Sequence, residues 1–163
     1  MKILITGPES SGKTYLANAL GKALNISVVE EYARTYLEEN GPEYTCKDLS
    51  RIAGAHLKQV DTFNHDRYIL DTFLLNIKIW SQDKFDRCEP WIIKEIEQLS
   101  FDKVLVLAPN IEWQPDPLRE DPSNRTELFD KFIEELDALK WDYAIIDKLE
   151  EERIKQALDY INS

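Results

Sequence analysis

Residues 1–20 read MKILITGPESSGKTYLANAL and contain the most informative pattern in the chain. Within them, residues 7–14, GPESSGKT, match the pattern G-x-x-x-x-G-K-[S/T] at every fixed position. The apolar residues 3–5 before this segment predict a short buried strand. The spacing of the apolar residues 16, 20, 23 and 24 after it predicts an amphipathic helix. A strand, a glycine-bearing loop and a helix in this order are typical of a loop that binds phosphate.

Each fixed position of this loop has a physical role. Gly7 lets the chain turn sharply off the strand, and Gly12 lets backbone N–H groups close on an anion. The helix that begins near Gly12 points its unpaired N–H groups and the positive end of its dipole at the same anion. We expect Lys13 to reach the β- and γ-phosphates of ATP and Thr14 to supply an oxygen to Mg²⁺. The predicted ATP-binding residues of the loop are Gly7, Glu9, Ser10, Ser11, Gly12, Lys13 and Thr14.

Composition narrows the possible partners. The 163 residues suit one domain spanning 1–163, and 20 basic against 31 acidic residues leave a formal net charge of −11. This charge argues against a nucleic acid bound over a broad surface. We expect no transmembrane helix and no membrane partner, because no long apolar run occurs, and no signal peptide, because the first strand leads directly into the loop. Cys46 and Cys88 are far apart and outside any C-x-x-C motif, which favours a reducing, cytoplasmic location.

The rest of the chain alternates strand-like and helical patterns. The strand-like runs lie near residues 2–6, 26–30, 67–71, 103–108 and 143–147. The runs VLVLA and YAIID are continuously apolar, as is typical of strands buried on both faces. The alternation predicts a three-layer α/β fold, with a five-stranded parallel sheet and helices on both faces.

Residues 109–124, PNIEWQPDPLREDPSN, interrupt this alternation. They contain four of the seven prolines, which predicts a long irregular loop. Trp113 and Arg119 favour a functional loop, placed where a kinase would have its lid. The alternative is an ordinary solvent-exposed connection.

Polar residues also follow the predicted strands, at the edge where open α/β sheets bind ligands. Glu30 and Glu31 follow the second strand, and strand alternation predicts that only one of them faces the site. A carboxylate there could accept the proton of an acceptor hydroxyl. Asp71 follows the third strand and could hold Mg²⁺. Three arginines could neutralise charge on a transferred phosphoryl group, although a structural ion pair is the alternative for each: Arg34, Arg119 and Arg125.

Taken in order, the segments GPESSGKT, EEYAR, LDTF and WQPDPLRED, with a later Arg125, resemble a known family. They resemble the ribosylnicotinamide kinase domain of the bifunctional NadR-type family of P-loop kinase-like NTPases, from about residue 3 to about residue 135. The family's Glu-Tyr-x-Arg pattern falls on Glu31, Tyr32 and Arg34, which favours Glu31 over Glu30 as the inward carboxylate. The remaining correspondences are Asp-Thr on Asp71 and Thr72, and Trp-x-x-Asp-x-Leu-Arg on Trp113, Asp116, Leu118 and Arg119.

The resemblance implies an activity. The family phosphorylates the 5′-hydroxyl of nicotinamide riboside with Mg-ATP, which gives the mononucleotide used to make NAD. It implies catalytic roles for Lys13, Glu31, Asp71 and Arg119, ATP binding by Arg125 in addition to the loop, and Mg²⁺ ligation by Thr14 and Asp71. It implies that the acceptor nucleoside is bound by Glu31, Tyr32, Arg34, Asp71, Trp113 and Asp116. Trp113 or Tyr32 could stack on the cationic pyridinium ring, and Asp116 or Glu31 could bind the ribose hydroxyls.

The chain departs from the family in two ways. Pro115 and Pro117 flank Asp116 where the family commonly has small residues, which predicts a stiffer or differently aimed loop. The family also has an adenylyltransferase domain ahead of the kinase, whereas this chain begins at the first kinase strand. We therefore expect a stand-alone kinase or a relative with a different acceptor.

Three other functions fit parts of the pattern. One is a kinase for another nucleoside or small molecule, and another is a small P-loop ATPase or regulatory module, which needs only an oriented water. RecA-like recombinases share the GPESSGKT loop alone, and the acidic chain disfavours DNA binding. The EEYAR and WQPDPLR segments favour a kinase, because a kinase requires a second pocket for its acceptor.

Overall fold

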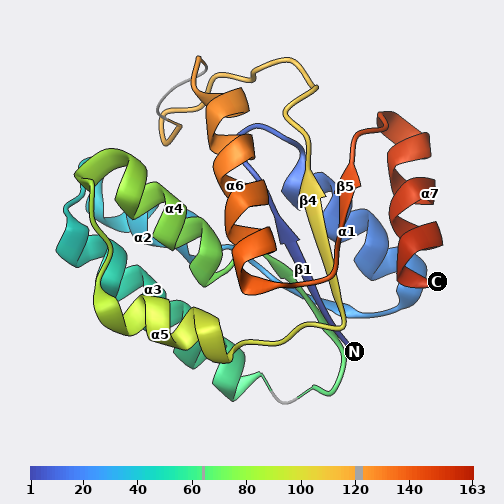
Figure 1. The fold of residues 1–163 in the computed structure, drawn as a ribbon, viewed down its shortest axis with the longest axis horizontal. Coiled ribbons are helices and arrows are strands. Elements are labelled where there is room, and N and C mark those ends of the chain that lie inside the picture. Colours follow the sequence, from blue (N-terminus) through green and yellow to red (C-terminus); the bar gives the residue numbers. More distant parts are fainter. Residues whose placement is uncertain (64, 120–122) are drawn as a thin grey trace.

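The computed structural model describes residues 1–63, 65–119 and 123–163, over which five strands and seven helices form (Figure 1). The strands are β1 (Lys2–Thr6), β2 (Ser27–Val29), β3 (Tyr68–Asp71), β4 (Lys103–Leu107) and β5 (Tyr143–Ile146). The helices are α1 (Lys13–Leu24), α2 (Tyr32–Asn40), α3 (Cys46–Thr62), α4 (Leu74–Phe85), α5 (Pro90–Gln98), α6 (Arg125–Leu139) and α7 (Glu150–Ile161). In the described part of the chain, no helix is long and apolar enough to cross a membrane.

All strands are parallel and lie in the order β2-β3-β1-β4-β5, which confirms the predicted five-stranded parallel sheet. The central strand is β1, where Leu4 lies beside Leu70 of β3 and Val104 of β4. The chain runs from β1 to one side of the sheet first and reaches β4 on the other side later. The loop after β1 therefore leaves the sheet where the strand order reverses, which is where such sheets bind ligands.

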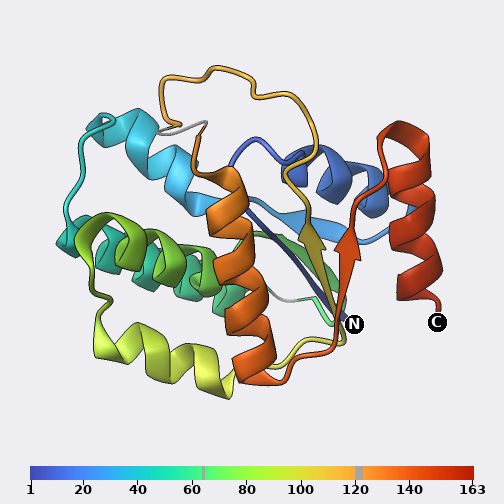
Figure 2. The ribbon, with the colours of Figure 1, turned by 45° about the horizontal axis from the view of Figure 1, so that its top comes forward.

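Helices cover both faces of the sheet, as the apolar runs predict. One core cluster joins α1 and α7 to the sheet, and the other joins helices α2 to α6 to its opposite face. Figure 2 shows this division, with α1 and α7 on one side of the strands and the remaining helices on the other. Burial on both faces explains why the central strands are almost continuously apolar.

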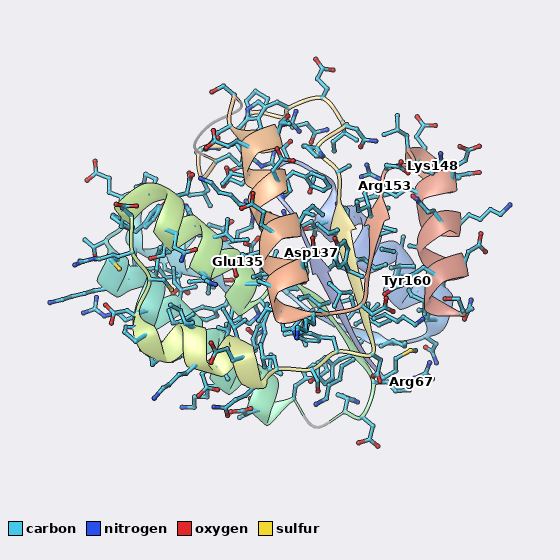
Figure 3. The ribbon with its side chains drawn as sticks, in the orientation of Figure 1. Arg67, Glu135, Asp137, Lys148, Arg153 and Tyr160 are labelled. Atoms are coloured by element: carbon cyan, nitrogen blue, oxygen red, sulfur yellow. The ribbon has the colours of Figure 1, made fainter. Side chains whose placement is uncertain are left out.

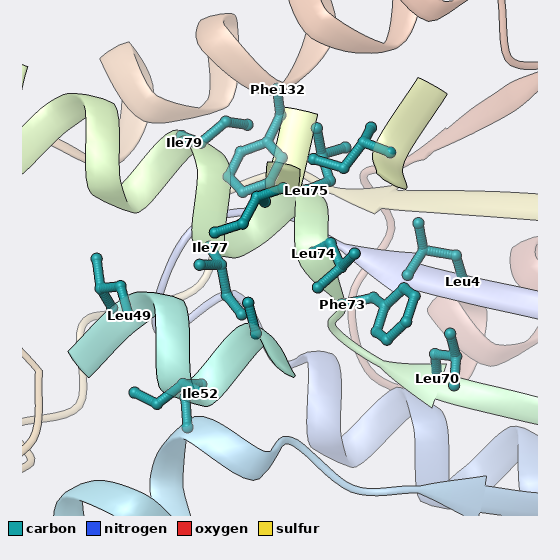
Figure 4. Packing of buried hydrophobic residues seen from close by; sticks show 14 of the residues in the cluster. Leu4, Leu49, Ile52, Leu70, Phe73, Leu74, Leu75, Ile77, Ile79 and Phe132 are labelled. Atoms are coloured by element: carbon teal, nitrogen blue, oxygen red, sulfur yellow. The ribbon is translucent and has the colours of Figure 1, made fainter. Parts of the chain in front are cut away.

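Helix α4 is the centre of the larger cluster (Figure 4). Leu74, Leu75, Ile77 and Ile79 are all at most 3% exposed and point in different directions around this helix. They pack against the sheet and against helices α3, α5 and α6. The first two turns of α4 are packed on several sides, which holds their polar residues in defined positions near the site described below.

Two features differ from the sequence predictions. Helix α2 was not predicted, because its nine residues contain only a short apolar pattern and its Glu31 cap makes no side-chain hydrogen bond to the helix. The run at 143–147 was expected to be buried on both faces, but β5 is an edge strand and Ile145 is 44% exposed. The continuous apolar run therefore correctly predicted a strand at this position, but it wrongly predicted that both faces of the strand are buried.

His56 of α3 gives a prediction about pH. Its side chain is 1% exposed, its Nε2 has no hydrogen-bond partner among the described residues, and its ring meets that of Phe73 edge-on at 4.9 Å. Burial lowers the pKa of His56 from 6.5 to about 4. The unfolded chain binds this proton below about pH 6.5 and the folded chain only near pH 4, so stability falls as the pH falls through this interval. The loss from this residue is about 3 kcal/mol.

Urea unfolding of the wild type and of His56→Leu at pH 7 and pH 4.5 measures this effect. The variant is expected to lose less stability on acidification than the wild type, while His65→Gln, outside the helices, behaves like the wild type. The same pH dependence in His56→Leu and the wild type would contradict the assignment.

Candidate active site

The loop after β1 has the backbone geometry of a phosphate-binding loop. Gly7, Ser10 and Gly12 have φ angles of 132°, 52° and 85°. A Cβ atom on Gly7 would lie 2.8 Å from the carbonyl oxygen of Leu107, so glycine is required where the loop passes β4. Gly12 caps α1 in the left-handed region, and the first N–H groups of the helix are thereby directed into the loop.

Asn76 of α4 holds the start of this loop in place. Its Oδ1 accepts a hydrogen bond from Thr6 Oγ1 at 2.7 Å, and its Nδ2 donates to the carbonyl oxygen of Gly7 at 3.1 Å. Asn76 was not among the residues predicted from the sequence. The available signal was a lone amide in the apolar stretch 73–80, where a buried polar group needs partners.

Thr14 and Asp71 are brought together from α1 and the end of β3. Thr14 Oγ1 donates to Asp71 Oδ2 at 2.6 Å, while Asp71 Oδ1 is buried without a hydrogen-bond partner among the described residues. Burial raises the pKa of the Asp71 carboxyl, although the bond from Thr14 and the charge of Lys13 oppose this shift. These hard oxygen atoms, one of them unsatisfied, form a site that suits Mg²⁺.

Lys13 and Glu31 face the same space. The Lys13 Nζ donates to the carbonyl oxygen of Pro8 at 2.7 Å. Burial lowers the pKa of Lys13, and the charges of Glu31, Asp71 and Glu9 act in the opposite direction. Burial likewise raises the pKa of Glu31, against the effect of Lys13. Glu31 lies on the wall of the cavity described below.

The loop that begins at residue 109 lies over the phosphate loop. The backbone N–H of Gln114 donates to Ser10 Oγ at 3.0 Å. The guanidinium of Arg125 donates to the carbonyl oxygens of Ser10 at 3.1 Å and Ile111 at 3.0 Å. Part of the predicted lid, residues 120–122, falls outside the described residues. The described part of this loop is therefore fastened to the phosphate loop by both backbone and side-chain bonds.

Trp113 packs against two of the predicted arginines. The Arg125 and Arg119 guanidiniums lie 5.6 Å and 6.0 Å from the centroid of its ring. Contacts at these distances are typical of cation–π pairs. In this conformation Trp113 supports the arginines rather than lining the cavity.

Arg34 of α2 holds the same loop from the other side. It donates to Asp116 Oδ2 at 2.8 Å, and this bond lowers the pKa of the Asp116 carboxyl. Asp116 Oδ1 also accepts the N–H of Leu118 at 2.9 Å. Asp116, which the resemblance assigns to the acceptor nucleoside, is thus paired with Arg34 in this conformation.

A cavity of about 320 Å³ connects the phosphate loop to a second, largely apolar compartment. The compartment lies between α2, α4, α6 and the loop, and its walls are Ala33, Leu37, Ile79, Trp80, Leu118, Leu128 and Phe132, with Asp83 and Asn124 as polar members. Of the predicted site residues outside the phosphate loop, Glu31, Arg34 and Arg119 line the cavity. Tyr32 instead packs against the larger core cluster.

The compartment residues Trp80 and Asp83 were not among those predicted from the sequence. Trp80 belongs to the apolar pattern of α4, so it was indistinguishable from a core residue. Asp83 receives hydrogen bonds from Lys131 at 2.7 Å and from Asn124 at 3.2 Å, both from the α6 region. Asp83, Asn124 and Lys131 come together only because α4 packs against α6 in the tertiary structure.

Comparison with known proteins agrees with this architecture. A protein-family model described as an AAA domain matches residues 2–153. The trifunctional NAD biosynthesis/regulator proteins NadR of Escherichia coli and Salmonella typhimurium are each 29% identical over 126 residues. These matches cover 72% of this chain and 30% of each NadR protein, so the chain spans under a third of the length of these relatives.

Solved structures have the same fold. The crystal structure of NadR protein in complex with NR has a TM-score of 0.81 at 23% identity, covering 99% of this chain and 50% of that one. A deoxyadenosine kinase from M. mycoides has a TM-score of 0.68 at 18% identity, with 99% of both chains covered. The resemblance to the NadR-type family that the motifs predicted is confirmed. Because the family model matches most of the chain, the protein belongs to the AAA domain family of P-loop proteins.

Proposed function

We propose that this protein is a nucleoside kinase of NAD metabolism, which transfers the γ-phosphoryl group of ATP to the 5′-hydroxyl of nicotinamide riboside. One observation carries the proposal. A single cavity joins the phosphate loop, past Glu31, to a second compartment with an apolar wall. An ATPase needs only an oriented water beside the phosphates, whereas a kinase needs such a second pocket for its acceptor.

The relatives support nicotinamide riboside as the acceptor. NadR proteins are described as NAD biosynthesis proteins, and NadR structures contain NR in one case and NAD with AMP-PNP in another. We take NR to be nicotinamide riboside. Its pyridinium ring is cationic and planar, and the cavity offers it the ring of Trp80 together with the carboxylates of Glu9, Glu31 and Asp83.

The proposed mechanism assigns a task to each group. The phosphate loop and Lys13 hold the triphosphate, and Arg119 stabilises the charge that develops on the transferred group. Glu31 or Asp71 orients the acceptor hydroxyl and takes its proton late, because phosphoryl transfer has a loose transition state. Residues 109–119 exclude water from the reacting groups.

Thr14 and Asp71 would hold Mg²⁺, which when bound neutralises charge on the phosphate oxygens. Asp71 is suited to this task because it has an unsatisfied buried oxygen. Thr14 brings a second hard oxygen next to it.

ADP release by the purified protein with Mg-ATP tests the proposal, alone and with each of nicotinamide riboside, deoxyadenosine, deoxycytidine and uridine. We expect ADP to rise with nicotinamide riboside, together with the mononucleotide. A rise with another nucleoside only would assign a different acceptor to the same site. An equal rise without any acceptor would make the protein an ATPase.

Trp80→Leu tests the acceptor compartment. Stacking of a base on an aromatic ring is worth about 1–3 kcal/mol, so we expect the KM for the nucleoside to rise about tenfold. The KM for ATP should stay within about twofold, because Trp80 lines the apolar compartment, whereas Asn76 is the residue of α4 that bonds to the phosphate loop. Trp141→Leu is the matched control, since Trp141 packs on Phe101 outside the cavity. Equal increases in both KM values would place Trp80 outside the acceptor pocket.

A further inference from the structure

Arg153 is a buried cation that the mechanism above does not use. It lies on α7 and is 3% exposed. Figure 3 shows it beside Lys148, where the chain passes from β5 into α7. Burial lowers the pKa of its guanidinium, and no carboxylate of the described residues offsets this shift. A buried charge without a counter-charge is costly, so its retention calls for a physical reason.

The guanidinium joins three separate segments of the chain. Its Nε donates to the carbonyl oxygen of Lys148 at 2.8 Å, and its Nη2 donates to Asn110 Oδ1 at 2.9 Å. Its Nη1 donates to the carbonyl oxygen of Ser11 at 2.7 Å, within the phosphate loop. The α7 helix is thereby attached both to the loop after β4 and to the loop expected to hold phosphate.

The contact with Ser11 acts on one particular peptide unit. The carbonyl of Ser11 and the N–H of Gly12 belong to the same amide group, so a hydrogen bond to the oxygen polarises the N–H and strengthens it as a donor. A Cβ atom on Gly12 would lie only 2.6 Å from Arg153 Nη1. The guanidinium therefore lies directly against the Gly12 backbone, whose φ of 85° favours glycine at this position.

We propose that Arg153 is a positioning residue for the polyphosphate of the nucleotide. It fixes and polarises the Ser11–Gly12 amide, and its positive charge lies behind the phosphate loop, where no carboxylate of the described residues forms an ion pair with it. A bound polyphosphate supplies the missing negative charge. The proposal rests on the proposed function only in that the phosphate loop binds nucleotide, and it is independent of the acceptor.

Isothermal titration with Mg-ATP and with tripolyphosphate tests the proposal in the wild type and three variants. Arg153→Met removes both the charge and the donors, and Arg153→Lys keeps the charge and one donor group. Lys155→Met removes a charge from an exposed position two residues further along the same helix. Thermal unfolding of each variant reports whether it is folded.

We expect Arg153→Met to raise the Kd for both ligands by about tenfold or more. Arg153→Lys should recover part of this loss, and Lys155→Met should change either Kd by less than about twofold. In turnover, Arg153→Met should raise the KM for ATP and leave the KM for the acceptor unchanged. If Arg153→Met does not fold, Arg153→Gln replaces it, with an expected rise of at least about threefold.

Two results would overturn the proposal. One is a folded Arg153→Met or Arg153→Gln protein with wild-type Kd values. The other is weaker binding of ATP with unchanged binding of tripolyphosphate, because Arg153 would then act only on the part of the site that holds the nucleoside. A wild-type protein that binds neither ligand would instead refute nucleotide binding by this loop. A wild-type protein that binds both but phosphorylates no nucleoside would refute the proposed function and leave the role of Arg153 intact.

Discussion

Replacing Lys13 with alanine is expected to lower kcat/KM for ADP formation by about a thousandfold or more. The ammonium group is held at the phosphate loop by its 2.7 Å bond to the Pro8 carbonyl, and the half-buried Lys13 side chain lines the cavity. A positive charge fixed there acts more strongly on the transferred phosphoryl group than it would in bulk water, because the cavity wall replaces part of the screening solvent. A neutral methyl group at this position can supply none of this stabilisation.

Initial rates at saturating and limiting ATP measure the effect, and circular dichroism establishes that the variant is folded. Lys22→Ala is the matched control, since Lys22 is an exposed lysine in the last turn of the same helix. We expect its rates to match those of the wild type. A Lys13→Ala protein with more than about a tenth of wild-type activity would show that the loop is not the catalytic phosphate site.

Replacing Asp71 with asparagine is expected to separate activity from stability. The change keeps the side-chain shape and an oxygen that can accept the Thr14 bond, but it removes the anionic oxygens that Mg²⁺ prefers. We expect activity to fall by about a hundredfold or more. Stability at pH 7 should remain unchanged or increase, because the substitution removes a carboxylate that is 2% exposed and has one unsatisfied oxygen.

The sign of the stability effect follows from the pKa shift. Burial raises the folded-state pKa of Asp71 above its unfolded value of 3.8, so the ionised carboxylate destabilises the fold at neutral pH. Below about pH 3.8 the carboxyl is protonated in both states and this penalty disappears. The stability difference between Asp71→Asn and the wild type should therefore shrink as the pH falls from 7 toward 4. Urea unfolding checks this, with the exposed Asp159→Asn as control. A variant that is less stable than the wild type at pH 7 would contradict the assignment.

Much of the fold could be predicted because its signals are local. The strand at residues 2–6, the loop GPESSGKT and the helix after it follow from one motif and its flanking apolar patterns. The alternation of apolar runs was sufficient for a parallel sheet. The exposure of Ile145 could not be predicted from the sequence. It arises because β5 lies at the edge of the sheet and has a neighbouring strand on one side only. Helix α2 was missed for a related reason, since its own apolar pattern is short and it packs against α3 and the core.

The residues of the candidate site likewise fall into those that the sequence could predict and those that it could not. Residues tied to a strand end or to the motif could be named in advance, and the structure brings Lys13, Thr14, Glu31 and Asp71 to one cavity region. Trp80 and Arg153 could not be named, because each is one aromatic or basic residue on an ordinary helix pattern. Their roles depend on which distant segment packs against them.

By itself, the sequence of this protein determined the motif of the phosphate loop, the order of its strands and the polar residues that follow them. These depend on spacing between residues close together in the chain, and short-range sterics and hydrogen bonding enforce them. The tertiary structure alone decided the shape of the second compartment, the pairing of Arg34 with Asp116 and the contact of Arg153 with the phosphate loop. These join residues that are 82 and 142 positions apart in the last two cases, and only the packing of whole elements brings such residues together.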